Sequence, residues 1–311
     1  MAKSKNSVWS IFIEGLRLYF RNFNKFFRYM AFPVFGQVLG LILMLLASFT
    51  YVENLPKLLA MGGFFDNFTS IFFILILLIL PGFFIFTKAF WDYLVAYGAI
   101  NSMAESMTKT GKLYDFSAHT EMITRRTAGF VGLWILFGIF TIVGFFPLFW
   151  VIAMILFVYF VLVFQVFTLE PDKSPVGCFK KSFAIIKGNF WSTLGLMTLL
   201  GALTYWLLPE AIKFLLNLGD ILTFFAMPLD GWAMQLPISE FNKFLLTTPT
   251  AYQITSIWIA KMTVTGLIGY IVICLTLPLR SICWTLWYKN LNKGEVKLDK
   301  KILDRAERSE K

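Results

Sequence analysis

The sequence predicts an all-α membrane protein with six transmembrane helices and cytoplasmic amphipathic helices that lie at the membrane interface. The chain is 58% hydrophobic and only 15% charged, with a mean hydropathy of +0.71. A soluble domain has about 25% charged residues, so this composition leaves too few polar side chains for a soluble surface. Six apolar stretches approach the ~20 residues that a helix needs to cross a bilayer. Basic residues gather on one side of these stretches.

The six predicted spans belong to one polytopic membrane domain, 1–295, which is followed by a charged tail, 296–311. The first apolar run is longer than the ~7–15 residues of a signal-peptide core, so we expect it to stay in the protein as a span. We expect Pro81–Gly82 to interrupt the second span and Pro209 to close the fifth. The predicted spans are 30–51, 71–95, 128–144, 147–169, 190–208 and 257–287.

Charge predicts the orientation of the spans. Residues 1–30 hold six Lys or Arg, the loops after spans two and four hold four each, and the chain from Arg280 onwards holds nine. The opposite side holds only four, Lys57, Lys213, Lys243 and Lys261, and Lys88 lies inside span two. Because Lys and Arg favour the cytoplasmic side, both termini should lie in the cytoplasm, in a bacterial cytoplasmic membrane.

The segment 211–227 complicates this topology. It is apolar, but it contains Lys213 and Asp220, and each costs ~2.5–3.5 kcal/mol at a bilayer centre. We expect it to lie on the outer surface as an amphipathic or re-entrant element. Whether it is surface, re-entrant or spanning stays open at this point.

Residues 174–190 predict an amphipathic helix that leads into a span. Ser174 is a candidate N-cap and Pro175 suits the first helical position. Apolar residues recur at helical spacing from Val176 to Phe190, and Trp191 is placed as an interfacial anchor. The stripe consists of Val176, Phe179, Phe183, Ile186 and Phe190.

The same pattern occurs at residues 7–23, displaced by 167 positions, where Ser7 matches Ser174 and Asn22 matches Asn189. A weaker third copy is Asp115–Arg126. Three parallel units are therefore predicted, each a cytoplasmic surface helix followed by a transmembrane hairpin; chance similarity in a Phe-rich chain is the alternative. Basic amphipathic helices respond to anionic lipid, although they could simply orient and cap the bundle. The candidate lipid-headgroup contacts are Arg17, Arg21, Lys25, Lys180, Lys181 and Lys187.

The search for chemistry is mostly negative. The single histidine, His119, has no partner for a metal site and is expected to be a solvated surface residue. No phosphate-binding loop, serine-nucleophile motif or dinucleotide motif occurs. We therefore predict no catalytic residue, no metal and no cofactor. The three cysteines show neither metal-site spacing nor a disulfide framework.

Ionisable residues within spans are the best remaining indicators of function. Lys88 and Asp92 lie four residues apart on one helix face, and Arg280 lies at a similar depth in span six. They are either interfacial anchors or part of a polar cavity. Asn101 and Gln165 are weaker candidates.

Residues 170–200 resemble a known family. They are similar to a motif that precedes the fifth span of a membrane domain. The similarity lies in Glu170, the Ser174–Pro175 turn, Lys180, Ser182 and Phe183, and the segment Gly188–Trp191. That domain is attached to some glycerophosphodiester phosphodiesterases and also occurs in stand-alone, YciC-like multi-pass proteins. The resemblance implies six spans and no established activity, because the phosphodiesterase catalytic domain is absent.

Two functions are compatible with these observations. The first is a non-enzymatic membrane protein whose basic helices engage anionic lipid or a partner complex, which includes a homo-oligomer or another membrane protein. The alternative is a transporter or channel for a lipid or a small hydrophobic solute. Nucleic acid is disfavoured as a partner because the basic residues lie beside the apolar spans.

Overall fold

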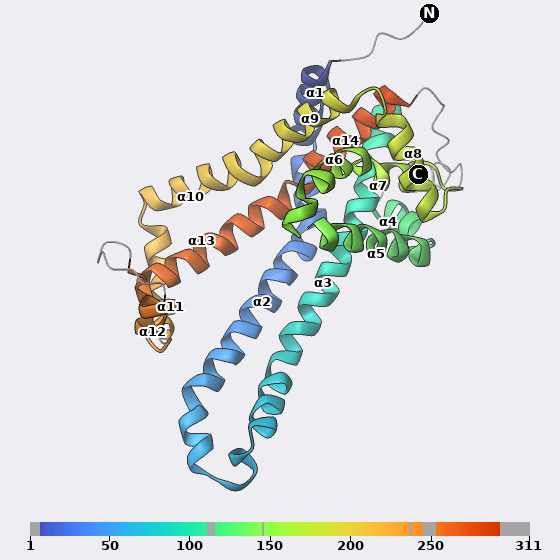
Figure 1. Ribbon diagram of the computed structural model, residues 1–311. Helices are drawn as coiled ribbons and strands as arrows, with labels where there is room; N and C mark the ends of the chain where they lie inside the picture. Colours follow the sequence, from blue (N-terminus) through green and yellow to red (C-terminus); the bar gives the residue numbers. More distant parts are fainter. Residues whose placement is uncertain (1–6, 111–115, 145, 237, 245–252, 293–311) are drawn as a thin grey trace, which may run out of the picture. The chain divides into compact units, whose positions relative to one another are not determined.

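The predicted all-α fold is confirmed. A computed structural model describes residues 7–110, 116–144, 146–236, 238–244 and 253–292, and every regular element in these ranges is helical (Figure 1). Six helical segments among them are long and apolar enough to cross a membrane: Phe23–Ala60, Phe68–Lys109, Thr127–Gly144, Pro147–Leu169, Phe190–Leu218 and Ser256–Leu291. The predicted tail 296–311 lies outside the described residues.

The elements follow one another with short connections. The first half contains α1 (Val8–Arg21), α2 (Phe23–Ala60), η1 (Gly63–Asp66), α3 (Phe68–Thr110), α4 (Phe116–Thr124), α5 (Thr127–Gly144), η2 (Pro147–Phe149), α6 (Trp150–Phe160) and α7 (Val163–Leu169). The second half contains α8 (Pro175–Ile186), α9 (Phe190–Gly201), η3 (Ala202–Leu207), α10 (Leu208–Leu218), α11 (Ile221–Ala233), α12 (Ile238–Phe244), α13 (Ser256–Leu275) and α14 (Leu277–Leu291).

Two proline predictions differ from the structure. Helix α3 continues through Pro81 and ends only at Thr110, well beyond the predicted end of span two. Pro209 does not close the fifth helical run, because η3 is a π-helix that leads directly into α10. A proline removes one helical hydrogen bond and its ring crowds the preceding turn, and a π turn just before it accommodates both effects.

The segment 211–227 forms parts of two helices. It includes most of α10 and the first half of α11, with the left-handed residue Asp220 (φ 52°) between them. Helix α11 has 13 residues and is therefore ~20 Å long, shorter than the ~30 Å hydrocarbon core. This length is consistent with a surface or re-entrant position for α11.

The described chain divides into two compact units. Unit 1 contains 1–30, 92–202 and 276–311, and unit 2 contains 31–91 and 203–275.

Unit 1 contains the three short helices of the predicted repeat, whereas the helices that follow the first and the third of them run on into unit 2. The short helices α1, α4 and α8 are each followed closely by another helix, and these following helices begin at Phe23, Thr127 and Phe190. The backbone N–H of Phe26 donates to Asn22, that of Phe130 to Arg126, and that of Thr193 to Asn189. These three bonds occupy equivalent positions, displaced by 104 and 167 residues from the first copy. Asp115, at the start of the predicted third copy, lies outside the described residues.

The N-caps and buried faces of the short helices also correspond. The Ser7 hydroxyl accepts from the N–H of Ser10, and the Ser174 hydroxyl accepts from the N–H of Gly177. Equivalent residues, spaced by four, are buried in all three copies. They are Ile11, Gly15 and Tyr19 in α1, His119 and Ile123 in α4, and Cys178, Ser182 and Ile186 in α8.

Each short helix packs on the helix that ends the preceding copy. On α4, His119 bonds to Ser102 of α3 and Ile123 approaches Gly98. Helix α8 packs on α7, and α1 packs on α14, where Gly15 lies directly against Cys283. Because the first copy packs on the end of the last, the three copies form a closed ring within unit 1.

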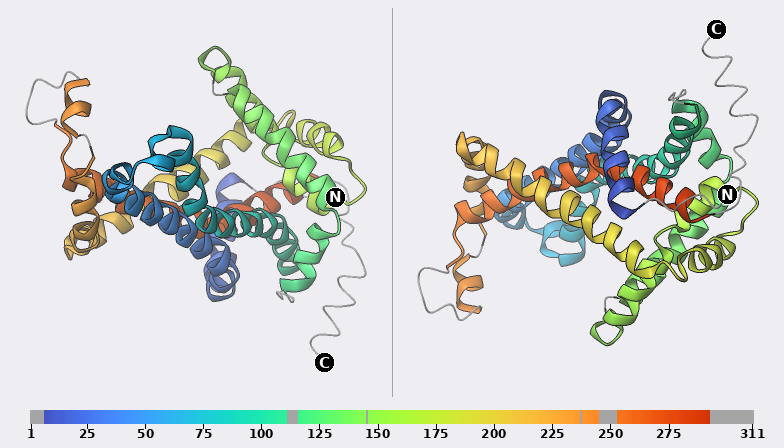
Figure 2. Two further views of the ribbon diagram at one scale, coloured as in Figure 1. Left: turned by 90° about the horizontal axis from the view of Figure 1, so that it is seen from below. Right: turned by 90° about the horizontal axis from the view of Figure 1, so that it is seen from above.

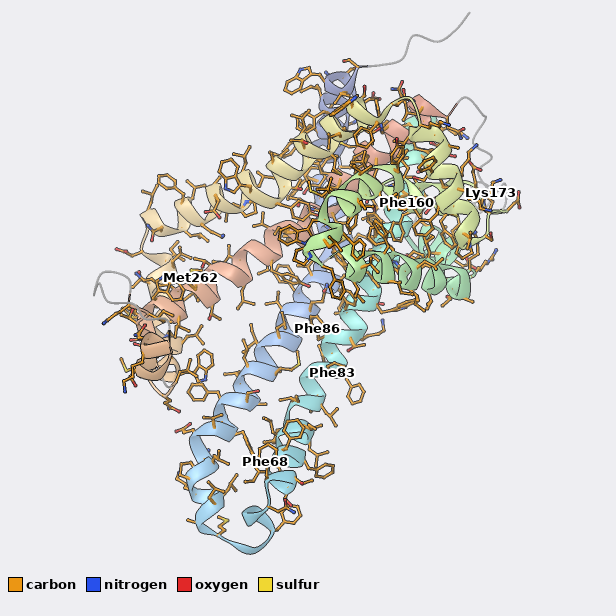
Figure 3. All side chains as sticks on the ribbon, viewed as in Figure 1. Phe68, Phe83, Phe86, Phe160, Lys173 and Met262 are labelled. Atoms are coloured by element: carbon orange, nitrogen blue, oxygen red, sulfur yellow. The ribbon has the colours of Figure 1, made fainter. Side chains whose placement is uncertain are left out.

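Unit 2 is built on the α2–α3 hairpin and on α10, α11 and α13. Gly40 and Gly82 allow the backbones of α2 and α3 to approach closely beside Phe86, while Phe68 and Phe83 on α3 are exposed (Figure 3). The hydroxyl of Tyr270 on α13 donates to the buried amide oxygen of Gln37 on α2. Helix α13 packs against both α10 and α11 (Figures 1 and 2).

Candidate functional site

The predicted headgroup contacts lie on the outer faces of α1 and α8 and just beyond them. Five of the six side chains are exposed: Arg17, Arg21, Lys25, Lys180 and Lys187. The exception is Lys181, whose Nζ lies 3.7 Å from a carboxylate oxygen of Glu170 and whose side chain is 35% exposed. Lys181 is therefore partly neutralised within unit 1, whereas the other five remain available to an anionic surface.

Exposed aromatic side chains accompany these basic residues. Trp9 and Phe20 on α1 are 60% and 64% exposed, and Trp191 at the start of α9 is 78% exposed. Trp is enriched at membrane–water interfaces, where its ring contacts the acyl region and its N–H stays hydrated. Basic and aromatic side chains that are exposed together are typical of helices that lie in the headgroup layer.

The packing of α8 differs from the predicted apolar stripe. The buried face carries Cys178, Ser182 and Ile186, and the Ser182 hydroxyl donates to the backbone oxygen of Tyr159 (2.7 Å). Val176 and Phe183 of the predicted stripe are exposed. Small and polar side chains face unit 1 because α8 approaches its neighbours closely. The large apolar side chains on the other face are therefore available to lipid.

Two stripe residues nevertheless contact α6. The Phe183 ring stacks on Tyr159 with centroids 4.4 Å apart, and Phe179 meets Phe160 edge-on at 5.0 Å. These ring pairs hold α8 against α6 while leaving one edge of the helix open.

The three predicted intramembrane residues have different environments. Lys88 is exposed on the part of α3 that belongs to unit 2. In unit 1, Asp92 is half-buried, and Arg280 is 7% exposed and donates to the hydroxyl of Thr276 (3.2 Å). Their joint role as a polar site stays a prediction.

A buried carboxylate that the sequence analysis missed lies in unit 1. Glu105 on α3 is fully buried, with one carboxylate oxygen 2.8 Å from Lys289 Nζ and the other 3.3 Å from Lys109 Nζ. Neither oxygen has a well-directed hydrogen bond within the described residues, so charge attraction holds this cluster. Lys289 also donates to the hydroxyl of Thr108 and thereby fastens α14 to α3.

Further polar side chains line the same helices. The Gln165 amide on α7 donates to the Asn101 oxygen on α3 (3.2 Å), and both side chains are fully buried. On α14, Tyr288 donates its hydroxyl proton to Glu170, while Ser281 is fully buried. The core where α3, α7 and α14 meet is therefore polar, although its members are neutral or paired.

The prediction that His119 is a solvated surface residue is wrong. Its ring is 1% exposed, and Nδ1 lies 2.9 Å from the Ser102 hydroxyl. Because α3 continues to Thr110, it presents Ser102 to α4 in a region that the sequence analysis placed in a loop. Residues 99–107 are rich in Ala, Ser and Met and contain neither Gly nor Pro. This composition was the feature of the sequence that could have indicated a continuing helix.

Burial and neighbouring charges shift the pKa values of Cys178 on α8 and of Arg126, which follows α4. Burial raises the pKa of the Cys178 thiol to about 11, and the positive charge of Arg126 partly opposes this shift. Burial also lowers the pKa of the Arg126 guanidinium. Arg126 donates to the backbone oxygens of Phe167 and Lys173 and lies 4.0 Å from the centre of the Phe167 ring. It therefore connects the start of α5 to the segment before α8.

The structure leaves the prediction of no catalytic residue untested. Within the described ranges, no group of three or more His, Cys, Asp or Glu is placed to hold a metal ion. The buried Glu105 is paired with Lys289, and the partly buried Glu170 accepts from Tyr288. Comparison with protein-family models, curated proteins and solved structures found no match to this chain. The resemblance to the phosphodiesterase-associated membrane domain stays a prediction.

Proposed function

We propose that this multi-pass membrane protein is non-enzymatic and binds anionic lipid headgroups through its repeated surface helices. The observation that carries the proposal is the outer face of α1, where Arg17 and Arg21 are exposed on the same helix as Trp9 and Phe20. Each basic residue near an anionic surface contributes about 1 kcal/mol to attraction. Several such residues on helices fastened to the spans would gather anionic lipid around the protein.

The mode of packing supports this function. The inner faces of α1 and α8 are occupied by contacts to α14 and α7, so the basic faces cannot turn inwards without breaking those contacts. A rigidly held basic face loses little conformational freedom when it binds lipid. Lys and Arg are concentrated around α1 and α8 and in the chain from Arg280 onwards. This distribution supports our proposal that these helices and both termini lie on the cytoplasmic side of a cytoplasmic membrane.

The proposal can be tested by the lipid preference of the full chain. The protein is reconstituted into nanodiscs that contain phosphatidylcholine with increasing fractions of phosphatidylglycerol, and bound lipid is counted by native mass spectrometry. We expect phosphatidylglycerol to be enriched around the wild-type protein relative to the bulk mixture. Replacing Arg17, Arg21 and Lys25 together by Gln should abolish most of this enrichment.

The matched control removes the same charge from positions that we expect on the opposite side of the membrane. A variant with Lys57, Lys243 and Lys261 changed to Gln has an equal net charge, so it should keep the enrichment. If the two triple variants lose phosphatidylglycerol equally, net charge explains the binding and the surface helices do not. If wild-type protein shows no preference, the proposal is wrong.

A further inference from the structure

Unit 2 contains a large apolar cavity. It has a volume of about 520 Å³ and lies among α2, α10, α11 and α13. This volume falls within the ~300–1,000 Å³ that is typical of ligand sites. The space is open on one side, so its apolar lining is accessible to an apolar molecule from the surroundings of unit 2.

The lining specifies the chemistry of an occupant. Fourteen of the fifteen lining side chains are apolar, from Val38 on α2 to Ile271 on α13. The exception is Thr263, whose hydroxyl already donates to the backbone oxygen of Ile259 (2.9 Å). Among the described residues, no charged group lines the cavity to hold a headgroup, a carboxylate or an ion. Water would lose hydrogen bonds there, because it needs two to four polar partners.

The volume excludes a helix as the occupant. A helix with side chains is ~10–12 Å across, so a single turn already fills on the order of 500 Å³. A segment long enough to pack stably would need several turns. A flexible hydrocarbon chain, which is much thinner, matches both the volume and the apolar lining.

The cavity is continuous with the surface of the spans that faces lipid. Ile42, Leu46 and Phe225 belong to its lining and are at the same time exposed. The α2 residues lie within a helix that is apolar enough to cross a membrane, so acyl chains surround them. Phospholipid is therefore the occupant that reaches the cavity without leaving the bilayer.

We propose that this cavity, between α2 and the α10–α11–α13 helices, is a binding site for one acyl chain of a membrane phospholipid. The headgroup remains outside the cavity, at the membrane surface. This site goes beyond the headgroup binding proposed above and does not depend on it, because its lining holds no basic residue.

Photocrosslinking of the wild-type protein provides a first test. The chain is reconstituted with a phosphatidylcholine that carries a diazirine on one acyl chain, and labelled residues are mapped by mass spectrometry after brief irradiation. We expect label on Val38, Phe225 and Leu267 to exceed that on exposed span residues outside the cavity, such as Phe83 and Met262 (Figure 3), by at least about tenfold. Equal labelling of the two sets would overturn the proposal.

A cavity-filling variant provides the second test. Leu267→Trp places an indole in the cavity, whereas Met262→Trp adds the same group to the same helix at an exposed position. After delipidation in detergent, wild type and Met262→Trp should retain one phospholipid per chain, and Leu267→Trp should lose it. Retention by Leu267→Trp contradicts the proposal.

A competition experiment distinguishes a phospholipid from a free fatty acid as the source of the bound acyl chain. Palmitic acid at equal concentration should displace little of the retained phospholipid, since it lacks the phosphate headgroup that we place at the membrane surface beside the cavity. If palmitic acid displaces it completely at equal concentration, the commitment to phospholipid is wrong. The triple variant of Arg17, Arg21 and Lys25 distinguishes the two proposals. If it loses the preference for phosphatidylglycerol and keeps the bound phospholipid, the acyl-chain site is independent of the headgroup-binding surface.

Discussion

At the scale of single residues, unit 1 contains a buried carboxylate, Glu105, that lies against two lysines. Glu105 has no access to solvent, and its two lysine partners are only partly exposed. A carboxylate in such a position is stable because the ammonium groups replace the lost hydration. The pair also joins α14 to α3 where the polar core approaches the surface.

Replacing Glu105 by Gln should therefore destabilise the protein. The change leaves Lys289 without its counter-charge, and we expect a loss of about 1–3 kcal/mol, less than for a fully buried cation because Lys289 can regain water. Thermal unfolding in detergent measures this loss. Glu121→Gln is the control: it breaks the exposed pair with Arg125 and should cost less than about 1 kcal/mol. Equal melting temperatures for the two variants would contradict this account.

The thiol of Cys178 should be unreactive in the folded protein near neutral pH. Its pKa rises to about 11 from 9.0, so the thiolate population falls about 100-fold at pH 8. Because the raised pKa favours the neutral thiol, the folded state gains stability from it below pH 9 and loses that gain as the pH rises towards 11.

Alkylation with iodoacetamide, followed by peptide mass spectrometry, measures this reactivity. We expect slow labelling of Cys178 in the native protein at pH 8, faster labelling towards pH 11, and rapid labelling at any of these pH values once the protein is unfolded. Native labelling at pH 8 as fast as that of the unfolded chain would be incompatible with the observed burial.

At this scale, the sequence predicts the helix caps and does not predict the burial of polar side chains. The N-cap residues Ser7 and Ser174 were predictable because capping depends on local chemistry alone. The burial of His119 and Glu105 was not predicted, because their partners Ser102 and Lys289 come from other helices. In a membrane protein, polar residues at the end of a long helix resemble a solvated loop until the packing is known.

At the scale of elements, the three short helices and their junctions form one repeated design. Small residues at the equivalent positions Gly15 and Ser182 permit close approach, whereas His119 occupies that position in α4. The first two copies were predictable from their shared spacing. The third became clear only from its backbone hydrogen bonds and buried face, since Arg126 and Thr127 stand where the other copies have Asn followed by Phe.

The contact between α1 and α14 should be sensitive to one added methyl group. A Cβ at position 15 would lie 2.2 Å from the sulfur of Cys283, so Gly15→Ala should cost about 1–3 kcal/mol by overpacking. Adding Cys283→Ala removes the clash and should restore most of the stability. Thermal unfolding of the single and double variants measures both effects.

Gly195→Ala in α9 is the matched control, because nothing lies within 4 Å of its added methyl group. This change should be neutral or stabilising by up to about 1 kcal/mol, since Ala favours helix over Gly. If the double variant is no more stable than Gly15→Ala alone, the packing of α1 on α14 differs from that described.

At the scale of the whole molecule, composition and charge were sufficient to predict the class of protein. Six apolar stretches were predicted, and six segments long and apolar enough to span a membrane are present. The helix bounds were less predictable: Pro209 lies within a continuous helical run because a π turn accommodates it. Local sequence cannot indicate whether neighbouring packing will stabilise such a turn.

The central claim is that three equivalent helices lie on one face of the membrane, with basic residues directed to its lipids. Cysteines at the equivalent exposed positions Phe20, Thr124 and Lys187 test it directly, with Asn67 and Asn217 as positions predicted to lie on the other side. Because the native cysteines are buried, a membrane-impermeant maleimide should leave the unaltered chain unlabelled.

In sealed vesicles of known orientation, we expect Phe20→Cys, Thr124→Cys and Lys187→Cys to react from the cytoplasmic side only. Asn67→Cys and Asn217→Cys should react from the opposite side only. Labelling of the three helix positions from different sides would contradict the parallel repeat and, with it, the proposed lipid-binding face.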